Sequence, residues 1–172
     1  VIPVTSVRLK AKEGKMKKEE IYEILQQVPD PEIPVLTIED LGIIRDVNIQ
    51  NDHIEVIITP TYSGCPAMDM IAVNIKAALQ EAGHHNVTIT TVLAPAWTTD
   101  WMSAAGREKL RAYGIAPPRV HEQAISIRSG TVNCPQCSSP NTEVINQFGS
   151  TACKSLRRCL DCLEPFDHFK EF

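Results

Sequence analysis

Apolar residues at helical spacing mark the first predicted element of the chain. Four of them follow Lys17 at positions i, i+3, i+4 and i+7: Ile21, Ile24, Leu25 and Val28. One face of an α-helix carries this spacing. The prolines of "PDPEIP", residues 29–34, then end the pattern, because proline disfavours helix in the residue before it. The sequence therefore predicts a helix that starts near Lys17 and ends before Pro29.

The pattern changes to alternation in "GIIRDVNIQNDHIEVIITP", residues 42–60. Two sets of apolar residues each share one strand face: Ile43, Val47 and Ile49, then Ile54, Val56 and Ile58. Asn51 and Asp52 between the two sets favour a tight turn. Pro60 ends the second strand because it cannot donate a ladder hydrogen bond. This segment predicts a β-hairpin.

The longest apolar stripe in the chain follows residue 66. Its members share one helix face: Met68, Ile71, Ala72, Ile75, Ala78, Leu79 and Ala82. Gly83 comes directly after the stripe and is typical of a helix C-terminus. The stripe predicts a helix that packs its apolar face against a sheet.

A third strand over 86–95 and a helix over about 100–113 complete the pattern, with Thr99 or Asp100 as the expected helix cap. The order α-β-β-α-β-α predicts a small α+β domain with helices packed on a mixed sheet. We expect this domain to occupy residues 16–130.

The end of the predicted domain lies in residues 114–133, which contain two adjacent prolines. A short alternating strand is expected there around Ile125 and Ile127. We expect the remaining residues, 131–172, to form a separate small module, with one strand in "NTEVINQFG" and a closing strand in "EPFDHFKEF". Residues 1–15 carry no periodic pattern, and we expect them to be a tail or leader without function.

Charge and hydropathy narrow the function classes. The 172 residues carry a net charge of −4, which lacks the basic excess of a general nucleic-acid binder. The sequence contains no apolar run long enough to span a bilayer and no secretory signal, so we expect neither a membrane nor a nucleic-acid partner. It also contains neither a P-loop nor a glycine-rich dinucleotide turn.

Cysteine spacing gives the strongest signal for a binding site. "CPQC" at 134–137 and "CLDC" at 159–162 place four cysteines as two pairs: Cys134, Cys137, Cys159 and Cys162. Two such knuckles bring four thiolates around one Zn²⁺ in a closed structural site. A rubredoxin-like iron site and two disulfides remain alternatives. Metal-binding cysteines fit a reducing compartment, so we expect a cytoplasmic protein with a C-terminal zinc ribbon.

Cys153 stands outside this paired spacing, and two interpretations of it remain open. It is either a free thiol with a role or a small residue on the ribbon surface. Lys154, Arg157 and Arg158 lie near it in sequence, and cations favour the thiolate form.

Cys65 is separated in sequence from the other cysteines, between Gly64 and Pro66 at the start of the long apolar helix. Proline suits the first helical position, which would make Cys65 the N-cap. There the helix dipole and free N–H groups favour a thiolate that can act as a nucleophile or bind metal. A small buried hydrophobic residue is the equally weighted alternative.

Two further sets of residues are candidates for a site or an interface. Asp30 and Glu32 in "DPEIP" are paired carboxylates that suit metal binding, although turn formation is the more frequent role of such residues. Trp97 and Trp101 in "WTTDW" would anchor a partner if exposed, whereas buried they belong to the core.

Taken together, four segments resemble the PaaD family of phenylacetate-degradation proteins, called PaaJ in some operons. These are "VPDPEIPVLTIEDLGIIRDV", "PTYSGCPAM", "LAPAWTTDWM" and the ribbon "CPQC…FGSTACKSLRRCLDCLEPFDHFK". The resemblance runs from about residue 17 to 172. Its first part, through about residue 118, is similar to the wider metal–sulfur cluster assembly scaffold family.

The resemblance implies an accessory or maturation component of the multicomponent 1,2-phenylacetyl-CoA epoxidase rather than an enzyme. Its partners would be the epoxidase subunits, namely the reductase, the di-iron oxygenase or both. It assigns the family cysteine to Cys65, the acidic motif to Asp30 and Glu32, and structural zinc to the ribbon.

Two functional hypotheses follow from the resemblance. In the first, Cys65 holds or delivers transient iron or an Fe–S cluster, either with Cys153 as a second sulfur or by bridging a cluster across a homodimer. In the second, the chain is a structural or docking component without metal-delivery chemistry, with the ribbon and the Trp97/Trp101 loop as contact surfaces.

Overall fold

A three-stranded mixed sheet forms the base of the N-terminal part in the computed structural model, which describes residues 17–119 and 131–172. β1 (Ile44–Gln50) pairs antiparallel with β2 (His53–Ile58), and β2 pairs parallel with β3 (Val87–Thr91). Asn51 has φ 55° in the turn between β1 and β2, which confirms the predicted hairpin. β3 is shorter than the predicted strand 86–95, and a cis peptide bond precedes Pro95.

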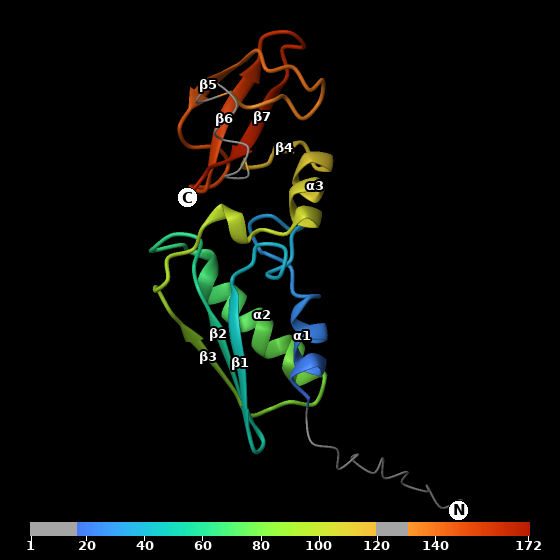
Figure 1. Ribbon diagram of the computed structural model, residues 1–172, viewed down its shortest axis with the longest axis vertical. Helices are drawn as coiled ribbons and strands as arrows, with labels where there is room; N and C mark the ends of the chain where they lie inside the picture. Colours follow the sequence, from blue (N-terminus) through green and yellow to red (C-terminus); the bar gives the residue numbers. More distant parts are fainter. Residues whose placement is uncertain (1–16, 120–130) are drawn as a thin grey trace, which may run out of the picture.

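Two helices cover one face of this sheet (Figure 1). α1 (Lys18–Leu25) and α2 (Ala67–Glu81) pack on each other and on β1 and β3. Alternate residues of β2 are buried beneath them: Ile54, Val56 and Ile58. On the opposite face, Glu55 accepts hydrogen bonds from Asn48 and Thr90. The period-2 alternation in the sequence therefore separates the core face from the polar face as predicted.

The predicted helix over 100–113 is two elements in the structure. A 3₁₀ turn, η1 (Thr99–Trp101), is followed by α3 (Ala104–Ala112). Met102 between them has extended backbone angles, so the helical hydrogen-bond pattern cannot run through it.

Ser103 caps α3, which corrects the expected cap at Thr99 or Asp100. The Ser103 hydroxyl accepts a hydrogen bond from the Gly106 N–H at 2.8 Å. Serine is a favoured N-cap residue, so the local chemistry is ordinary although the predicted position was wrong.

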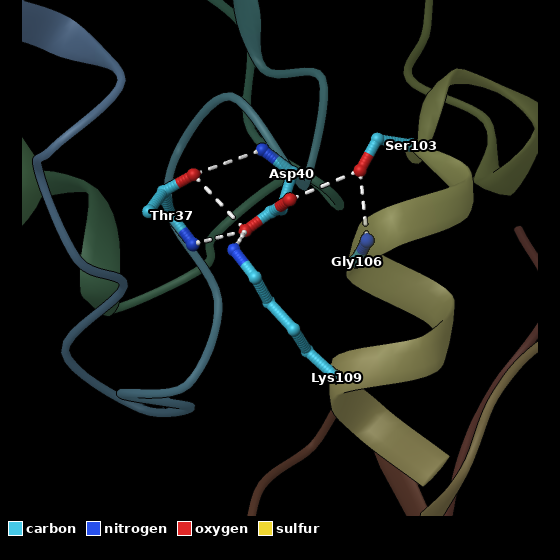
Figure 2. A network of polar contacts seen from close by, with 5 residues as sticks. All are labelled: Thr37, Asp40, Ser103, Gly106 and Lys109. Atoms are coloured by element: carbon cyan, nitrogen blue, oxygen red, sulfur yellow. Dashed lines mark hydrogen bonds and ion pairs between the residues drawn. The ribbon is translucent and has the colours of Figure 1, made fainter. Parts of the chain in front are cut away.

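Asp40 ties the loop before β1 to α3 (Figure 2). One carboxylate oxygen accepts hydrogen bonds from the backbone N–H and hydroxyl of Thr37, and Lys109 lies 2.6 Å from the same oxygen. The other oxygen accepts from Ser103 at 3.0 Å. Gly106 makes this approach possible, because a Cβ there would lie 3.0 Å from the Asp40 Cβ.

A second sheet builds the ribbon at the other end of the molecule (Figure 1). Its strand order is β4-β7-β6-β5, with these bounds: β4 (Ile115–Ala116), β5 (Thr142–Asn146), β6 (Lys154–Cys159) and β7 (Pro165–Phe169). β5, β6 and β7 form an antiparallel meander, whereas β4 pairs parallel with β7. The two ribbon strands predicted from sequence are therefore present.

The hydrophobic core of the N-terminal part extends into the ribbon, which also has a smaller buried cluster of its own. Cys153 and Phe169 of the ribbon are buried in the same cluster as α1, α2 and the first sheet. β4 precedes the expected boundary at residue 130, yet it is an edge strand of the ribbon sheet. The strand expected around Ile125 and Ile127 lies outside the described residues. The overall class is confirmed as an α+β domain followed by a ribbon.

Among residues 17–119 and 131–172, no helix combines the length and apolar character needed to cross a membrane.

Candidate functional site

The four paired cysteines of the ribbon form a compact thiol cluster. The Sγ atoms of Cys134 and Cys162 lie 3.7 Å apart, and those of Cys137 and Cys159 lie 3.6 Å apart. All four lie within 4.8 Å of one another. Zn–S bonds of about 2.3 Å in a tetrahedron place sulfurs about 3.8 Å apart, so this geometry fits a closed zinc site.

Backbone N–H groups support the thiolate of Cys159 in this cluster. The Cys162 N–H lies 3.5 Å from the Cys159 Sγ. This donor, together with the Asp161 N–H, lowers the pKa of Cys159 to about 7. Thiolate is the form that binds metal, so Cys159 is prepared for ligation. In Cys162, by contrast, the Glu164 N–H lowers the pKa but burial and the neighbouring cysteines outweigh it and raise the pKa to about 12.

Cys65 lies in the loop that leads from β2 into α2. Its backbone N–H donates to the Tyr62 carbonyl at 3.2 Å, and its sulfur accepts a hydrogen bond from the Ala67 N–H. Gly64 makes this turn with φ 89°. Pro66 takes the N-cap position that was predicted for Cys65, so Cys65 lies one residue before the observed N-cap.

Burial outweighs the helix terminus in setting the protonation of Cys65. Desolvation raises the pKa of the half-buried Cys65 thiol, and the Glu32 carboxylate raises it further. The Ala67 N–H and the Thr61 and Tyr62 side chains oppose this but do not reverse it. The expectation of a thiolate at Cys65 is therefore wrong for the metal-free protein, because desolvation penalises the charged form.

Cys153 lies on the ribbon but is buried against the N-terminal part. Its Sγ lies 2.9 Å from the Thr151 hydroxyl and 4.0 Å from a carboxylate oxygen of Glu32. Burial raises the pKa of this thiol, and Lys154 lowers it without reversing the shift. The ribbon places Cys153 at an internal interface, so its interpretation as a small residue on the ribbon surface is wrong.

The sequence also suggested that two nearby arginines favour a Cys153 thiolate. Arg158 instead pairs with Glu143, and Arg157 donates to Thr142 at 3.3 Å. Both are therefore engaged at β5, on the far side of the ribbon strand that follows Cys153.

The two carboxylates of the acidic motif have different surroundings. Asp30 is buried and accepts hydrogen bonds from the backbone N–H groups of Glu32 and Ile33 at 2.9 and 2.7 Å. Asp30 therefore forms the turn, the alternative role weighed from sequence. Glu32 is turned toward Cys153, and burial followed by the Asp30 charge raises its pKa.

The two tryptophans do not form an exposed surface. Trp97 is buried, and its indole N–H donates to the Leu41 carbonyl at 2.9 Å. Trp101 is half-buried, with the Arg45 guanidinium 3.8 Å from its ring centre. Trp97 is thus wrong as a partner anchor, because the ribbon of the same chain covers it.

The residues that sequence reasoning missed are aromatic. Tyr62 stacks on Phe172 with ring centres 6.0 Å apart, and Trp97 lies 6.2 Å from both Phe169 and Phe172. Burial and the nearby Cys65 and Glu32 raise the pKa of Tyr62 to about 12. Tyr62 lies in the cysteine loop and could have been noticed for that reason. Phe172 carried no sequence signal, since its contact depends on the ribbon folding back.

Comparison with known proteins divides the chain into the same two parts, an N-terminal part and a ribbon. The family model described as "Iron-sulfur cluster assembly protein" matches residues 18–91. The model described as "PaaD zinc beta ribbon domain" matches residues 119–170. These matches correspond to the first sheet with its helices and to the ribbon.

Relatives resemble the chain over different lengths. An Escherichia coli K12 protein, named as a putative subunit of 1,2-phenylacetyl-CoA epoxidase, is 50% identical over 151 residues, covering 88% of this chain and 91% of that protein. The Bacillus subtilis "Fe-S protein maturation auxiliary factor YitW" is 38% identical, covering 50% of this chain and 85% of that protein.

A crystal structure of a domain of unknown function, DUF59, from Bacillus anthracis is similar to this chain with a TM-score of 0.50. The match is 27% identical and covers 54% of this chain and 90% of that one. The metal–sulfur assembly fold of the N-terminal part, the ribbon and the extended identity to the epoxidase protein agree with one another. The chain therefore belongs to the PaaD family, in which an iron–sulfur cluster assembly domain is followed by a zinc ribbon.

Proposed function

We propose that this protein is an accessory component of a phenylacetyl-CoA epoxidase and helps to mature an iron–sulfur or iron centre of a partner protein. The observation that carries the proposal is the placement of Cys65 on the loop before α2 beside Glu32, within the part that matches the iron–sulfur assembly family. Similarity to the Escherichia coli epoxidase protein over most of the chain supplies the epoxidase context.

The chemistry of the loop supports a carrier more than a catalyst. Thiolates are the ligands of iron–sulfur clusters, and a half-buried sulfur near the surface can exchange its cargo with another protein. The ribbon has a different role in this proposal, because its four sulfurs fit structural Zn²⁺ and leave no coordination position open.

The test is cluster content in a partner protein. We expect Cys65→Ser, co-expressed with the reductase and oxygenase subunits, to lower the iron and sulfide content of the reductase severalfold. Ser63→Ala is the matched control, because Ser63 is exposed in the same loop. Unchanged cluster and iron content in both partners with Cys65→Ser would overturn the maturation proposal.

A docking function is the second candidate, and exposed apolar residues of the ribbon favour it. Val144 and Ile145 of β5 are 43% and 52% exposed, and Phe148 is 64% exposed. Edge strands with exposed apolar side chains are typical contact sites for other chains. Under this alternative, Ile145→Asp abolishes co-purification with the epoxidase subunits, whereas Cys65→Ser leaves both co-purification and cluster content unchanged.

A further inference from the structure

The charge of one carboxylate acts on two thiols from distant parts of the chain. Cys65 comes from the loop before α2, and Cys153 comes from the ribbon just before β6. Glu32 lies 4.0 Å from the Cys153 sulfur, and its negative charge acts on both thiols. The charges of Glu32 and both thiols also act on the hydroxyl of Tyr62. The ribbon therefore brings a second sulfur to the neighbourhood of the Cys65 loop.

The charge of the Glu32 carboxylate is not balanced by a direct ion pair with any described residue. Within residues 17–119 and 131–172, no lysine, arginine or histidine makes such a pair with it. Lys154, a cation that acts on it through space, lies 3.7 Å from Asp167 instead. Because Lys154 also faces Asp167, it offsets the negative charge of the half-buried Glu32 only in part, so the cluster is suited to bind a cation.

Aromatic rings cover this cluster on the ribbon side. Phe172 stacks on Tyr62 of the cysteine loop, and its backbone carbonyl accepts a hydrogen bond from the Thr99 N–H at 3.4 Å. Figure 1 shows the labelled C end at the junction between the ribbon and the N-terminal part. The Tyr62–Phe172 pair displaces part of the water beside the cluster, although Phe172 is itself 43% exposed, and this partial displacement strengthens electrostatic attraction between the cluster and a bound ion.

We propose that Cys65, Cys153 and Glu32 bind one thiophilic divalent cation, with Fe²⁺ as the cargo, and that the ribbon supplies the second thiolate. This inference rests on the proposed maturation function and names its cargo and ligands. Binding releases one proton from each thiol to solvent, forms two metal–sulfur bonds and one metal–oxygen bond, and changes no oxidation state.

Cation binding requires a local movement of Cys65. Among the described residues, the four ribbon cysteines are the one group of three or more such ligands already within 4.8 Å of one another. The Cys65 side chain must therefore turn toward Cys153 and Glu32 when the ion binds. Three protein ligands leave a fourth position open, which suits an ion that is passed on, unlike the closed set of the ribbon.

The test is a Co²⁺ titration of the full chain whose ribbon has been loaded with one equivalent of Zn²⁺, under anaerobic conditions. We expect one Co²⁺ to bind beyond the zinc, with thiolate-to-cobalt charge-transfer absorption, and Fe²⁺ to compete with it. Cys153→Ser and Glu32→Gln each weaken Co²⁺ affinity by at least about tenfold, since even outer-shell changes cost that much. Glu39→Gln in the same acidic loop leaves the affinity unchanged, because Glu39 is exposed and bonds to Gln26.

Thiol protection provides a readout that separates ligation from folding. In the wild-type chain, Co²⁺ slows iodoacetamide labelling of both Cys65 and Cys153. In Cys153→Ala, Co²⁺ no longer protects Cys65, while zinc content and thermal unfolding confirm that the ribbon is intact.

Two outcomes would overturn the inference. Loss of Co²⁺ affinity in Cys65→Ser, with full affinity in Cys153→Ser and Cys153→Ala, would place the site on the loop alone and overturn the inference. Absence of Co²⁺ binding beyond the zinc would also overturn it. Neither result contradicts the maturation proposal. That proposal is tested independently by the cluster content of the partner proteins.

Discussion

The ribbon cysteines and the Cys65–Cys153 pair are two thiol groups built in opposite ways. The ribbon site brings together sulfurs from two short knuckles, each with its own turn, and all four lie within 4.8 Å. The second group joins a loop of the N-terminal part to a ribbon residue 88 positions further along the sequence (153 − 65 = 88). The first is preorganised by local chain geometry, whereas the second exists only because the two parts dock.

The protonation of Cys159 also differs from that of Cys65 and Cys153. Backbone N–H donors in the knuckle lower the pKa of Cys159 to about 7, whereas burial raises the pKa of both Cys65 and Cys153. Local donors prepare Cys159 for permanent metal binding, although the pKa values of Cys137 and Cys162 in the same group are raised. Desolvation keeps the other protonated, and so less reactive, until a cation compensates for the cost.

The largest expected effect comes from breaking the local site. Cys159→Ser should abolish stoichiometric zinc binding and unfold the ribbon, because structural zinc contributes about 10–16 kcal/mol in zinc-finger peptides. Metal analysis and amide hydrogen exchange of β5, β6 and β7 measure this. Cys153→Ser should keep one zinc per chain, and equal zinc loss in the two variants would refute the distinction between the two thiol groups.

The next largest effect comes from breaking the docking contact. Phe169→Ala should reduce the free energy of unfolding by about 3–5 kcal/mol, because the ring is 1% exposed and packs against Trp97. Zinc content should stay at one per chain while iodoacetamide labelling of Cys153 accelerates. Phe148→Ala, at a 64% exposed ring, is the matched control and should change stability by less than about 0.5 kcal/mol. Loss of zinc in Phe169→Ala would show that the ribbon does not hold its metal independently of docking.

The smallest expected effects come from two carboxylates. Asp40 forms an ion pair with Lys109, whereas Glu32 forms none with a described residue. Burial alone would raise the pKa of Asp40, but hydrogen bonds from Lys109, the Thr37 N–H and Ser103 hold it below its ordinary value. Asp40 therefore stabilises the fold above its unfolded-state pKa, and this contribution disappears as pH falls through the lower folded-state pKa. Asp40→Asn should cost about 1–2 kcal/mol at neutral pH, discounted because Lys109 is 45% exposed.

The ionised form of Glu32 changes stability in the opposite direction to that of Asp40. Burial, reinforced by Asp30, raises its pKa, so its ionised form costs stability once pH exceeds the unfolded-state value. Glu32→Gln should therefore stabilise the metal-free protein slightly at neutral pH, with the gain vanishing in acid. Urea unfolding at a series of pH values measures both variants. A loss of stability at neutral pH in Glu32→Gln would argue that its carboxylate is compensated in the folded protein.

Sequence reasoning succeeded where structure is local. The sequence pattern predicted the hairpin, the long helix α2 and the ribbon strands β5 and β7, but not β6, and C-x-x-C spacing predicted the four-sulfur set. It erred at α3, because Met102 adopts an extended conformation that no propensity rule indicates and Ser103 starts a new helix. It predicted the wrong protonation for Cys65, because the helix terminus is visible in sequence whereas desolvation by packed neighbours is not.

The remaining features depend on docking. Whether Trp97 is exposed, what surrounds Cys153 and where Phe172 lies are all settled by contacts between segments far apart in the chain. Asp30 and Asp40 look alike in sequence, but one forms a turn and the other links the loop before β1 to α3. Their partners, not their spacing, distinguish them.

The parallel pairing of β4 with β7 has a consequence for the order of assembly during synthesis. Ile115 must wait for Asp167, its register partner, which the ribosome adds 52 residues later (167 − 115 = 52). N-terminal domains generally fold first, so the nascent chain passes through a stage in which β4 is an open edge and the Cys65 loop lacks its aromatic cover. Zinc capture by the ribbon would end that stage. Availability of zinc would then set the moment at which the protein becomes able to carry any other metal.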